Sequence, residues 1–289
     1  MSENNTRLGI FLMVAATLVF AVQDGISSHL ASTYNVFMVV MIRYWFLATF
    51  VIAVAARKGG GLRRTAATRQ PILQIIRGLL LAAEICVMIA AFTYLGLVES
   101  HAVFTSYPLL IAALSGPILG EKVGWRRWGA IGIGFVGILV ILRPGVAVFS
   151  PYAAIPLAAA FLFALYGLLT RYAARKDTAA TSFFWTGIVG AVVMTAIGAF
   201  HWENMTNPDW VWMGILCVTG ALGHWLLIKC YEAAEASAVQ PFAYLQLIFS
   251  SAIGLIFLGE MLRLNVAIGA VIVVSAGLFT LWRTHQVKS

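Results

Sequence analysis

Residues 107–143 read YPLLIAALSGPILGEKVGWRRWGAIGIGFVGILVILR, and they hold two long apolar runs separated by a short basic loop. The loop contains Lys122, Arg126 and Arg127, whereas the runs on either side of it are almost free of charge. A helix needs about 20 mostly apolar residues to cross the hydrocarbon core of a membrane, because each residue adds about 1.5 Å. The two runs therefore predict two transmembrane helices joined by a turn.

The composition extends this interpretation to the whole chain. Of its 289 residues, 61% are hydrophobic and only 10% are charged. A soluble domain carries about 25% charged residues, and a single core stops growing at roughly 250–300 residues. A larger core cannot account for the missing charge, so lipid must cover much of the surface. The expected fold class is an all-α integral membrane protein.

Ten apolar stretches are long enough to be spanning helices, and the loops between them are short. The first stretch lacks a cleavage site followed by a soluble domain, so we expect a membrane helix there and not a signal peptide. The expected spans are 8–28, 35–56, 72–94, 101–119, 125–143, 151–172, 181–200, 210–230, 238–258 and 264–282.

The basic residues indicate how these spans are oriented, since the cytoplasmic loops of membrane proteins are rich in lysine and arginine. With the N-terminus in the cytoplasm, only Arg143 and Arg263 fall in outer loops, and Arg43 falls within a span. The others among the 19 basic residues lie on the inner side. We therefore expect both termini in the cytoplasm and a location in the inner membrane of a bacterial cell. The net charge of +8 reflects these loops and does not indicate nucleic-acid binding.

The sequence contains no motif that indicates a cofactor or a metal. The three cysteines, Cys86, Cys217 and Cys230, lie in apolar segments without paired spacing. Residues 132–137 match the dinucleotide fingerprint G-x-G-x-x-G, but no strand precedes them and they lie within an apolar span. Small residues of this kind provide close packing between membrane helices. We expect no cofactor, and no nucleophile–base or metal-ligand pattern indicates an enzyme.

The two halves of the chain share a pattern that predicts an internal repeat. Leu119-Gly120-Glu121 ends span four, and Leu258-Gly259-Glu260 ends span nine. Each unit would contain five spans, and because five is odd, the second unit must enter the membrane in the opposite orientation. A chance likeness between apolar stretches is the alternative. The expected units are 1–143 and 144–289, and further matched pairs are Gly129 with Gly269, Gly137 with Gly277, Arg143 with Arg283, and less closely Phe20-Ala21 with Phe163-Ala164 and Tyr94 with Tyr231.

With these features the sequence resembles the drug/metabolite transporter superfamily, in particular its EamA-type permeases. The resemblance covers essentially the whole chain, and it includes the Gly-Glu pair after the fourth helix of each half, Pro108 in span four and the segment QPFAYLQL at 240–247. Span nine departs from it, because it lacks a central proline like Pro108. The resemblance implies a bundle of helices around a central cavity. Within the superfamily, the sequence is similar to bacterial exporters of aromatic and other neutral amino acids.

Ionisable residues within spans are costly and usually face a cavity or one another. Glu84, in span three, is a candidate for binding a substrate ammonium group or carrying a proton, and His224, in the equivalent span eight, could form a proton relay with it. Hydrogen bonds that hold the bundle together are the alternative for both. Asp24 and Arg43 lie at similar depth in spans one and two, where we expect a structural ion pair. Recognition of a substrate carboxylate by Arg43 is the alternative.

Aromatic and amide side chains within the spans complete the expected substrate site. Aromatic rings suit the side chain of an aromatic solute, and amides suit the head group of an amino acid. Glu121 and Glu260, at the membrane borders, are expected to favour the N-terminus of the next helix through its dipole. The expected substrate-binding residues are Gln23, Glu84, Tyr94, Tyr107, Tyr166, Trp185, His224, Gln240, Tyr244 and Gln246.

Together these features predict a secondary transporter that exports small metabolites, above all aromatic or neutral amino acids, by alternating access. A permease for another metabolite or a drug-like compound is the alternative. The expected partners are a small-molecule substrate and the lipid bilayer, with no nucleic acid. The sequence leaves open whether transport is coupled to protons and in which net direction it runs. It also leaves the oligomeric state open, and it is compatible with a monomer.

Overall fold

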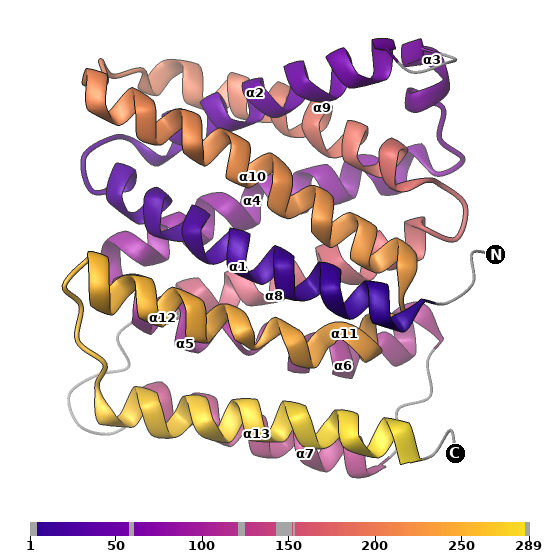
Figure 1. The fold of residues 1–289 in the computed structure, drawn as a ribbon, viewed down its shortest axis with the longest axis vertical. Coiled ribbons are helices and arrows are strands. Elements are labelled where there is room, and N and C mark those ends of the chain that lie inside the picture. The colour runs from indigo at the N-terminus through magenta and orange to yellow at the C-terminus, as the bar shows by residue number, and fades with distance from the viewer. Residues whose placement is uncertain (1–4, 58–60, 121–124, 143–151, 153, 287–289) are drawn as a thin grey trace.

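The computed structural model describes residues 5–57, 61–120, 125–142, 152 and 154–286. Every regular element in this part of the chain is a helix, and most helices run side by side along a common direction (Figure 1). Seven helical segments are long and apolar enough to cross a membrane. They are α1 (Thr6–Ala31), α2 (Val36–Arg57), α4 (Pro71–Leu95), the successive α5 (Leu97–Phe104) and α6 (Tyr107–Leu119), α8 (Ala154–Ala173), α9 (Ala179–Gly198) with η2 (Ala199–His201), and α10 (Asn207–Ala233).

The other helices are short or have shorter apolar stretches. α7 (Trp125–Leu142), α12 (Leu245–Phe257) and α13 (Leu264–Gln286) contain apolar segments of 10–17 residues. α3 (Gly61–Ala66) has 6 residues and α11 (Ala236–Ala243) has 8. The all-α membrane class predicted from the composition is confirmed.

Two of the predicted spans are divided by a turn. The sequence predicts one continuous helix over 101–119, but Thr105 and Ser106 form a turn between α5 and α6. Pro108 in the first turn of α6 favours this break, since a proline lacks an N–H group and clashes with the turn before it, whereas the first turn of a helix accommodates it. Tyr244 separates α11 from α12 within the predicted span 238–258.

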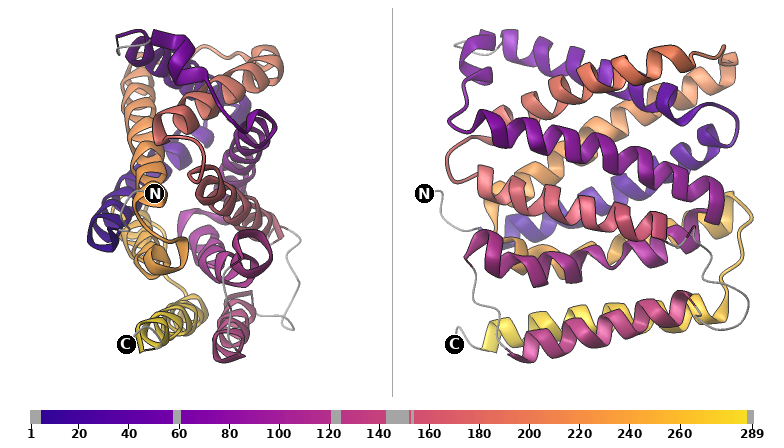
Figure 2. Two further views of the ribbon diagram at one scale, coloured as in Figure 1. Left: turned by 90° about the vertical axis from the view of Figure 1, so that its right-hand side faces the viewer. Right: turned by 180° about the vertical axis from the view of Figure 1, so that it is seen from behind.

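The helices pack in pairs that bring distant parts of the chain together. α1 packs against α10 and α12, and α8 packs against α4 and α6. α2 lies beside α9, and α7 lies beside α13 at one end of the molecule (Figures 1 and 2). One large apolar core joins α1, α2, α4, α8 and α10, and a smaller one joins α7 and α13 to α5 and α12. Side chains in the middle of the larger group are therefore covered by neighbouring helices.

Glu260 caps a helix other than the one expected. Its two carboxylate oxygens accept hydrogen bonds from the backbone N–H groups of Leu97 and Val98, at 2.7 and 2.8 Å. These residues begin α5, whereas the sequence analysis expected Glu260 to favour the start of the following helix, α13. The expected partner of Glu260 was therefore wrong. The free N–H groups and the dipole of a helix N-terminus stabilise a carboxylate at this position. Gly96, with a φ of 78°, turns the chain from α4 into α5 beside this carboxylate. Glu121 lies outside the described residues.

The glycines of the stretch 132–137 differ in how closely a neighbouring helix approaches them. Gly137 lies where α7 meets α13, and a Cβ atom there would lie 2.9 Å from the backbone oxygen of Gly269. A Cβ atom at Gly269 would in turn lie 2.6 Å from the backbone oxygen of Gly137. Gly132, by contrast, has open space at its Cβ position. Close helix contact therefore depends on Gly137 and not on Gly132.

Alanine substitutions at these two glycines separate packing from helix propensity. Gly137→Ala is expected to lower the free energy of unfolding by about 1–3 kcal/mol, because its methyl group pushes α7 and α13 apart. Gly132→Ala has the same gain in helix propensity, about 1 kcal/mol, without this clash. Thermal unfolding of the detergent-solubilised variants measures the difference. Equal melting temperatures would contradict the close contact at Gly137.

Candidate functional site

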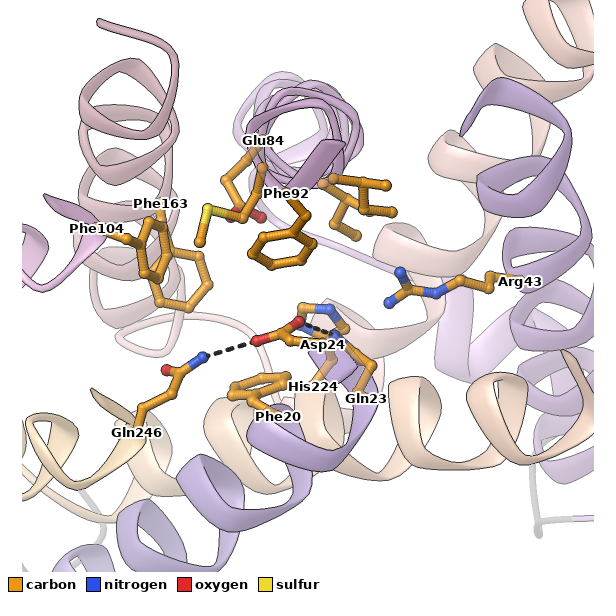
Figure 3. Close-up of a pocket in the computed structure, with 13 residues that line it drawn as sticks. Phe20, Gln23, Asp24, Arg43, Glu84, Phe92, Phe104, Phe163, His224 and Gln246 are labelled. Atoms are coloured by element: carbon orange, nitrogen blue, oxygen red, sulfur yellow. Dashed lines mark hydrogen bonds between the residues drawn. The ribbon is translucent and has the colours of Figure 1, made fainter. Parts of the chain in front are cut away.

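A small polar cavity lies in the middle of the bundle. Helices α1, α2, α4, α5, α8, α10 and α12 contribute side chains to it (Figure 3). Its volume is about 30 Å³, which is room for water but not for a metabolite. The cavity is therefore too small for a metabolite in this structure, and its lining must move apart before a solute can bind. The lining residues are Phe20, Gln23, Asp24, Arg43, Glu84, Ile85, Met88, Ile89, Phe92, Phe104, Phe163, His224 and Gln246.

Besides His224, three ionisable side chains face this cavity although it is surrounded by apolar helices. Asp24, Arg43 and Glu84 are only 8%, 7% and 5% exposed. Moving a charge out of water costs several kcal/mol unless a partner compensates for the lost hydration. The partners of these three groups therefore decide what the cavity can bind.

Asp24 has its partners within the protein. The amide nitrogens of Gln23 and Gln246 donate to its two carboxylate oxygens, each at 3.1 Å. In Figure 3 these two amides reach Asp24 from opposite sides. The Nε2 atom of His101 lies 3.2 Å from one of the carboxylate oxygens. One carboxylate thus connects α1 to α5 and α12.

Arg43 is not the partner of Asp24, in contrast to the ion pair expected from the sequence. Both residues line the cavity, but the ion pairs among the described residues do not include one between them. The expectation was wrong because helix packing brings His101 and two amides to Asp24, and these groups occupy its oxygens instead.

Arg43 and Glu84 are buried charges with no hydrogen bond or ion pair to another described residue. Arg43 enters the cavity beside Gly220 of α10, where a Cβ atom would lie 3.2 Å from its Nη2 atom. Glu84 reaches the cavity from α4 (Figure 3). A guanidinium and a carboxylate that face one cavity without partners are suited to a solute that carries both opposite charges.

Further polar atoms of the lining are also without partners. Both ring nitrogens of His224 and the amide oxygens of Gln23 and Gln246 are buried and have no hydrogen bond within the described part of the chain. Roughly 90% or more of buried polar groups in proteins are paired, so each exception calls for an explanation. The common position of these atoms at the cavity indicates that they are available to a polar solute.

Phenylalanines form the apolar wall of the cavity. Phe20 meets Phe163 edge to face with ring centroids 6.4 Å apart, and Phe104 lies 5.5 Å from Phe163. Phe20 also contacts the His224 ring at 5.0 Å, and Phe92 lines the cavity from α4. The faces of such rings bind planar groups and cations.

The cavity brings together four of the residues that the sequence analysis assigns to the substrate site. These are Gln23, Glu84, His224 and Gln246. No contact joins Glu84 to His224 among the described residues, so their role as a proton relay stays a prediction. The side chain of Gln240 lies outside the described part of the structure.

The aromatic residues of the expected set whose side chains the structure describes do not line the cavity, although the rings of Tyr107 and Tyr166 pack against its wall at Phe163. Tyr94 is exposed and stacks on Tyr152 with a centroid distance of 4.8 Å. The Nε1 atom of Trp185 donates to the backbone oxygen of Ala66 at 3.0 Å. The other three are buried in the contacts between helices: Tyr107, Tyr166 and Tyr244.

The phenylalanine wall is the main feature that sequence reasoning misses. A phenylalanine within a span is ordinary lipid-facing or core composition, so it carries no signal by itself. The match of Phe20-Ala21 with Phe163-Ala164 was a usable signal, since both phenylalanines line the cavity. His101 is recognisable in the sequence only as one more polar residue within a span.

Long apolar helices that enclose unpaired charges define the class of this protein. Charged residues inside a membrane bundle usually mark the path of a solute or an ion. In secondary transporters the solute site lies near the middle of the bilayer, between bundles that move relative to each other. The fold and the closed polar cavity are therefore those of a multi-pass membrane transporter.

Comparison with known proteins identifies the family. The family model described as the EamA-like transporter family matches residues 7–143 and again residues 151–282. The chain belongs to this family, and it is a multi-pass protein of a bacterial inner membrane. A solved crystal structure of another protein has the same fold, with a TM-score of 0.70, 15% identity and coverage of 98% of both chains.

Similar proteins are named as transporters of different small molecules. The S-adenosylmethionine uptake transporter of Rickettsia felis is 26% identical over 98% of this chain and 95% of its own. The riboflavin transporter of Vibrio cholerae is 27% identical over 96% of this chain and 94% of its own. The pseudopaline exporter of Pseudomonas aeruginosa is 22% identical over 93% and 94%. This chain is therefore a transporter of a small metabolite.

A second buried arginine shows what a fully paired charge looks like in this protein. Arg77 is 0% exposed, and its Nε and Nη2 atoms donate to Oγ1 of Thr170 at 3.0 and 2.9 Å. Its Nη1 atom donates to Gln74, and its guanidinium lies 5.2 Å from the centre of the Tyr166 ring. Arg77 thus joins α4 to α8, whereas the guanidinium of Arg43 joins no described helices by hydrogen bonds.

Glutamine substitutions at the two arginines are expected to differ in their effect on stability. Arg77→Gln should lower the free energy of unfolding by about 2–5 kcal/mol, because it leaves buried hydrogen-bonding partners unpaired. Arg43→Gln removes a buried charge without a partner, so stability should fall by less than about 1 kcal/mol or rise. Thermal unfolding in detergent compares them. A larger loss for Arg43→Gln would show that Arg43 has a structural role.

Proposed function

We propose that the protein transports a small metabolite in which an amino-acid head group is joined to a planar or aromatic group. Its family and its relatives support a small-metabolite transporter, and the unpaired charges of the cavity support the head group. The amino-acid substrate expected from the sequence is retained in this wider form. S-adenosylmethionine is the compound of this class that we place first.

The observation that carries the proposal is the pair of unpartnered charges, Arg43 and Glu84, at one cavity. An α-carboxylate matches the planar guanidinium of Arg43, which can donate two parallel hydrogen bonds to it. An α-ammonium group matches the carboxylate of Glu84. One zwitterion would therefore pair both buried charges at once and remove the cost of leaving them isolated.

The set of ionisable groups favours a cationic member of this class. Asp24 and Glu84 bring two carboxyl groups to the cavity and Arg43 brings one guanidinium. S-adenosylmethionine carries an ammonium, a sulfonium and a carboxylate, which are the complement of these three groups. Its adenine ring and its sulfonium centre also suit the phenylalanine faces of the wall.

The other named solutes match these charges less well. Riboflavin has neither a carboxylate nor an ammonium group, so it would leave Arg43 and Glu84 buried and unpaired. An aromatic amino acid would pair both of them and leave Asp24 with its own protein partners, so it is the second compound of the class. The same experiment therefore tests whether an aromatic or neutral amino acid is the solute.

We also propose that the chain forms ten spans in two inverted units, 1–143 and 144–289. Two separate matches to one family model support a repeat. The packing of the helices supports the repeat as well. If each helix of a packed pair is replaced by its equivalent in the other unit, the resulting two helices also pack together. α1 with α10 corresponds to α8 with α4, and α1 with α12 corresponds to α8 with α6. α2 with α9 and α7 with α13 are pairs of equivalent helices.

The proposed symmetry and the small cavity support alternating access. A volume of about 30 Å³ cannot admit a metabolite, so the cavity must widen for transport, and we propose that the units separate on one side at a time. The mechanism permits net movement in either direction along the solute gradient. Export, the direction expected from the sequence, is therefore tested separately from the identity of the solute.

The test is uptake by proteoliposomes that contain the purified protein. Labelled S-adenosylmethionine should accumulate saturably, and unlabelled phenylalanine should compete more strongly than riboflavin. Decarboxylated S-adenosylmethionine should be transported at least about tenfold less well, because Arg43 loses its partner. An imposed pH gradient shows whether Glu84 and His224 couple transport to protons.

Matched variants connect this result to the cavity. Arg43→Gln should abolish the preference for the carboxylated compound, and Glu84→Gln should weaken transport of both compounds. Glu99→Gln is the control, because Glu99 pairs with Arg263 at 3.1 Å and does not line the cavity. Saturable uptake of riboflavin that neither amino acids nor S-adenosylmethionine reduce would refute the proposed substrate class.

A further inference from the structure

A second, larger hollow lies at the edge of the bundle between α2, α9 and α10, and we call it the lateral groove. Its volume is about 480 Å³, within the roughly 300–1,000 Å³ of clefts that hold ligands. Apart from Thr65, its lining consists of alanine, valine, leucine, phenylalanine and tryptophan side chains. Phe50 and Val218 on its walls are 45% and 55% exposed, so the groove opens to the outside of the bundle.

The lateral groove lies in the half of the bundle that the bias of basic residues assigns to the cytoplasmic leaflet. α2 ends at this side and α9 begins here, and Ala55 and Ala180 near these two helix ends both line the groove. α3 lies at the same side (Figure 1), and its Thr65 borders the mouth. The groove therefore faces the acyl chains of the inner leaflet, with its mouth near their head groups.

Basic residues lie next to the lining residues in the chain. Arg63 and Arg64 precede Thr65 on α3, Arg57 follows Ala55 at the end of α2, and all three are exposed. The acidic groups on the neighbouring helices already have partners. Asp177 accepts hydrogen bonds from the segment that leads into α4, and Glu232 accepts one from the backbone N–H at the start of α9. The mouth therefore offers positive charge to an external anion.

We propose that the lateral groove binds an anionic phospholipid of the cytoplasmic leaflet, with one acyl chain along its walls and the phosphate at Arg63 and Arg64. An acyl chain matches a wall that provides one hydroxyl group and otherwise only apolar surface. Basic pockets between membrane helices on this side bind anionic head groups, and each basic residue near the surface strengthens the attraction about fivefold.

This lipid would contact two helices that carry the charged site. α2 holds Arg43 and α10 holds His224, and the groove lies between these two helices. When the bundle opens, any change in the spacing of α2 and α10 changes the groove, so the lipid stabilises one of the transport states. The proposal does not depend on which solute the protein carries.

Native mass spectrometry of the full-length protein tests the head group. Detergent-purified protein is mixed with phosphatidylglycerol or phosphatidylcholine at equal concentration, and the bound lipids are counted. Arg63→Gln and Arg64→Gln should each reduce phosphatidylglycerol binding about fivefold and leave phosphatidylcholine unchanged. Arg7→Gln removes an exposed basic residue at the start of α1, away from the groove, and should have no effect. Unchanged phosphatidylglycerol binding in the α3 variants would overturn the proposal.

A second pair of variants tests the groove itself. Val218→Trp fills it, whereas Val211→Trp places the same ring two turns away on α10, at a residue that is 64% exposed and not part of the groove. Phosphatidylglycerol binding should fall in the first variant only, with thermal unfolding showing that both are folded. Equal binding in both variants would mean general lipid association. If Val218→Trp changed the monomer–dimer ratio without loss of lipid, the groove would be a contact between two copies of this protein and not a lipid site.

Discussion

Hydrocarbon provides no hydrogen bonds and does not hydrate charges, and this constraint governs the whole structure. Each polar group in the bundle must find its partner within the protein or accept the cost of isolation. Arg77 meets this demand through Thr170, Gln74 and the Tyr166 ring. Arg43, in an equally buried position, does not. The contrast separates a charge that holds helices together from one that is available to a solute.

The same constraint explains how much the sequence could predict. Apolar runs and basic loops report the cost of moving each segment into lipid, so the all-α membrane class follows from composition. Glu84 and His224 were predictable as polar residues of the bundle interior for the same reason, since a buried ionisable group needs a cause, whereas Arg43 was expected in a structural ion pair. The turn at Tyr244 and the cap that Glu260 provides to α5 were not predictable, because both depend on contacts between distant helices.

The errors in the site have a common physical origin. Sequence spacing gives the depth of a residue in the membrane but not the direction in which its side chain points around the helix axis. Asp24 and Arg43 were paired because of similar depth, yet Gln246 and His101 from other helices reach Asp24 instead. Tyrosines and a tryptophan were expected to provide the aromatic surface of the site, and only the packing shows that Phe20 and Phe163 form the wall.

Under the alternating access proposed above, the unpaired groups also provide a reason for the protein to cross between its two access states more readily when it is loaded. Closing the cavity around Arg43 and Glu84 without a solute leaves two charges in a poorly hydrated space. A zwitterion in the cavity pairs both, so it stabilises the closed form more than the open forms, in which water reaches the charges. Because only such differential binding can shift a conformational equilibrium, the solute itself lowers the free energy of the state through which transport must pass. A solute with only one of the two charges would leave the other isolated and would be carried slowly even if it bound well.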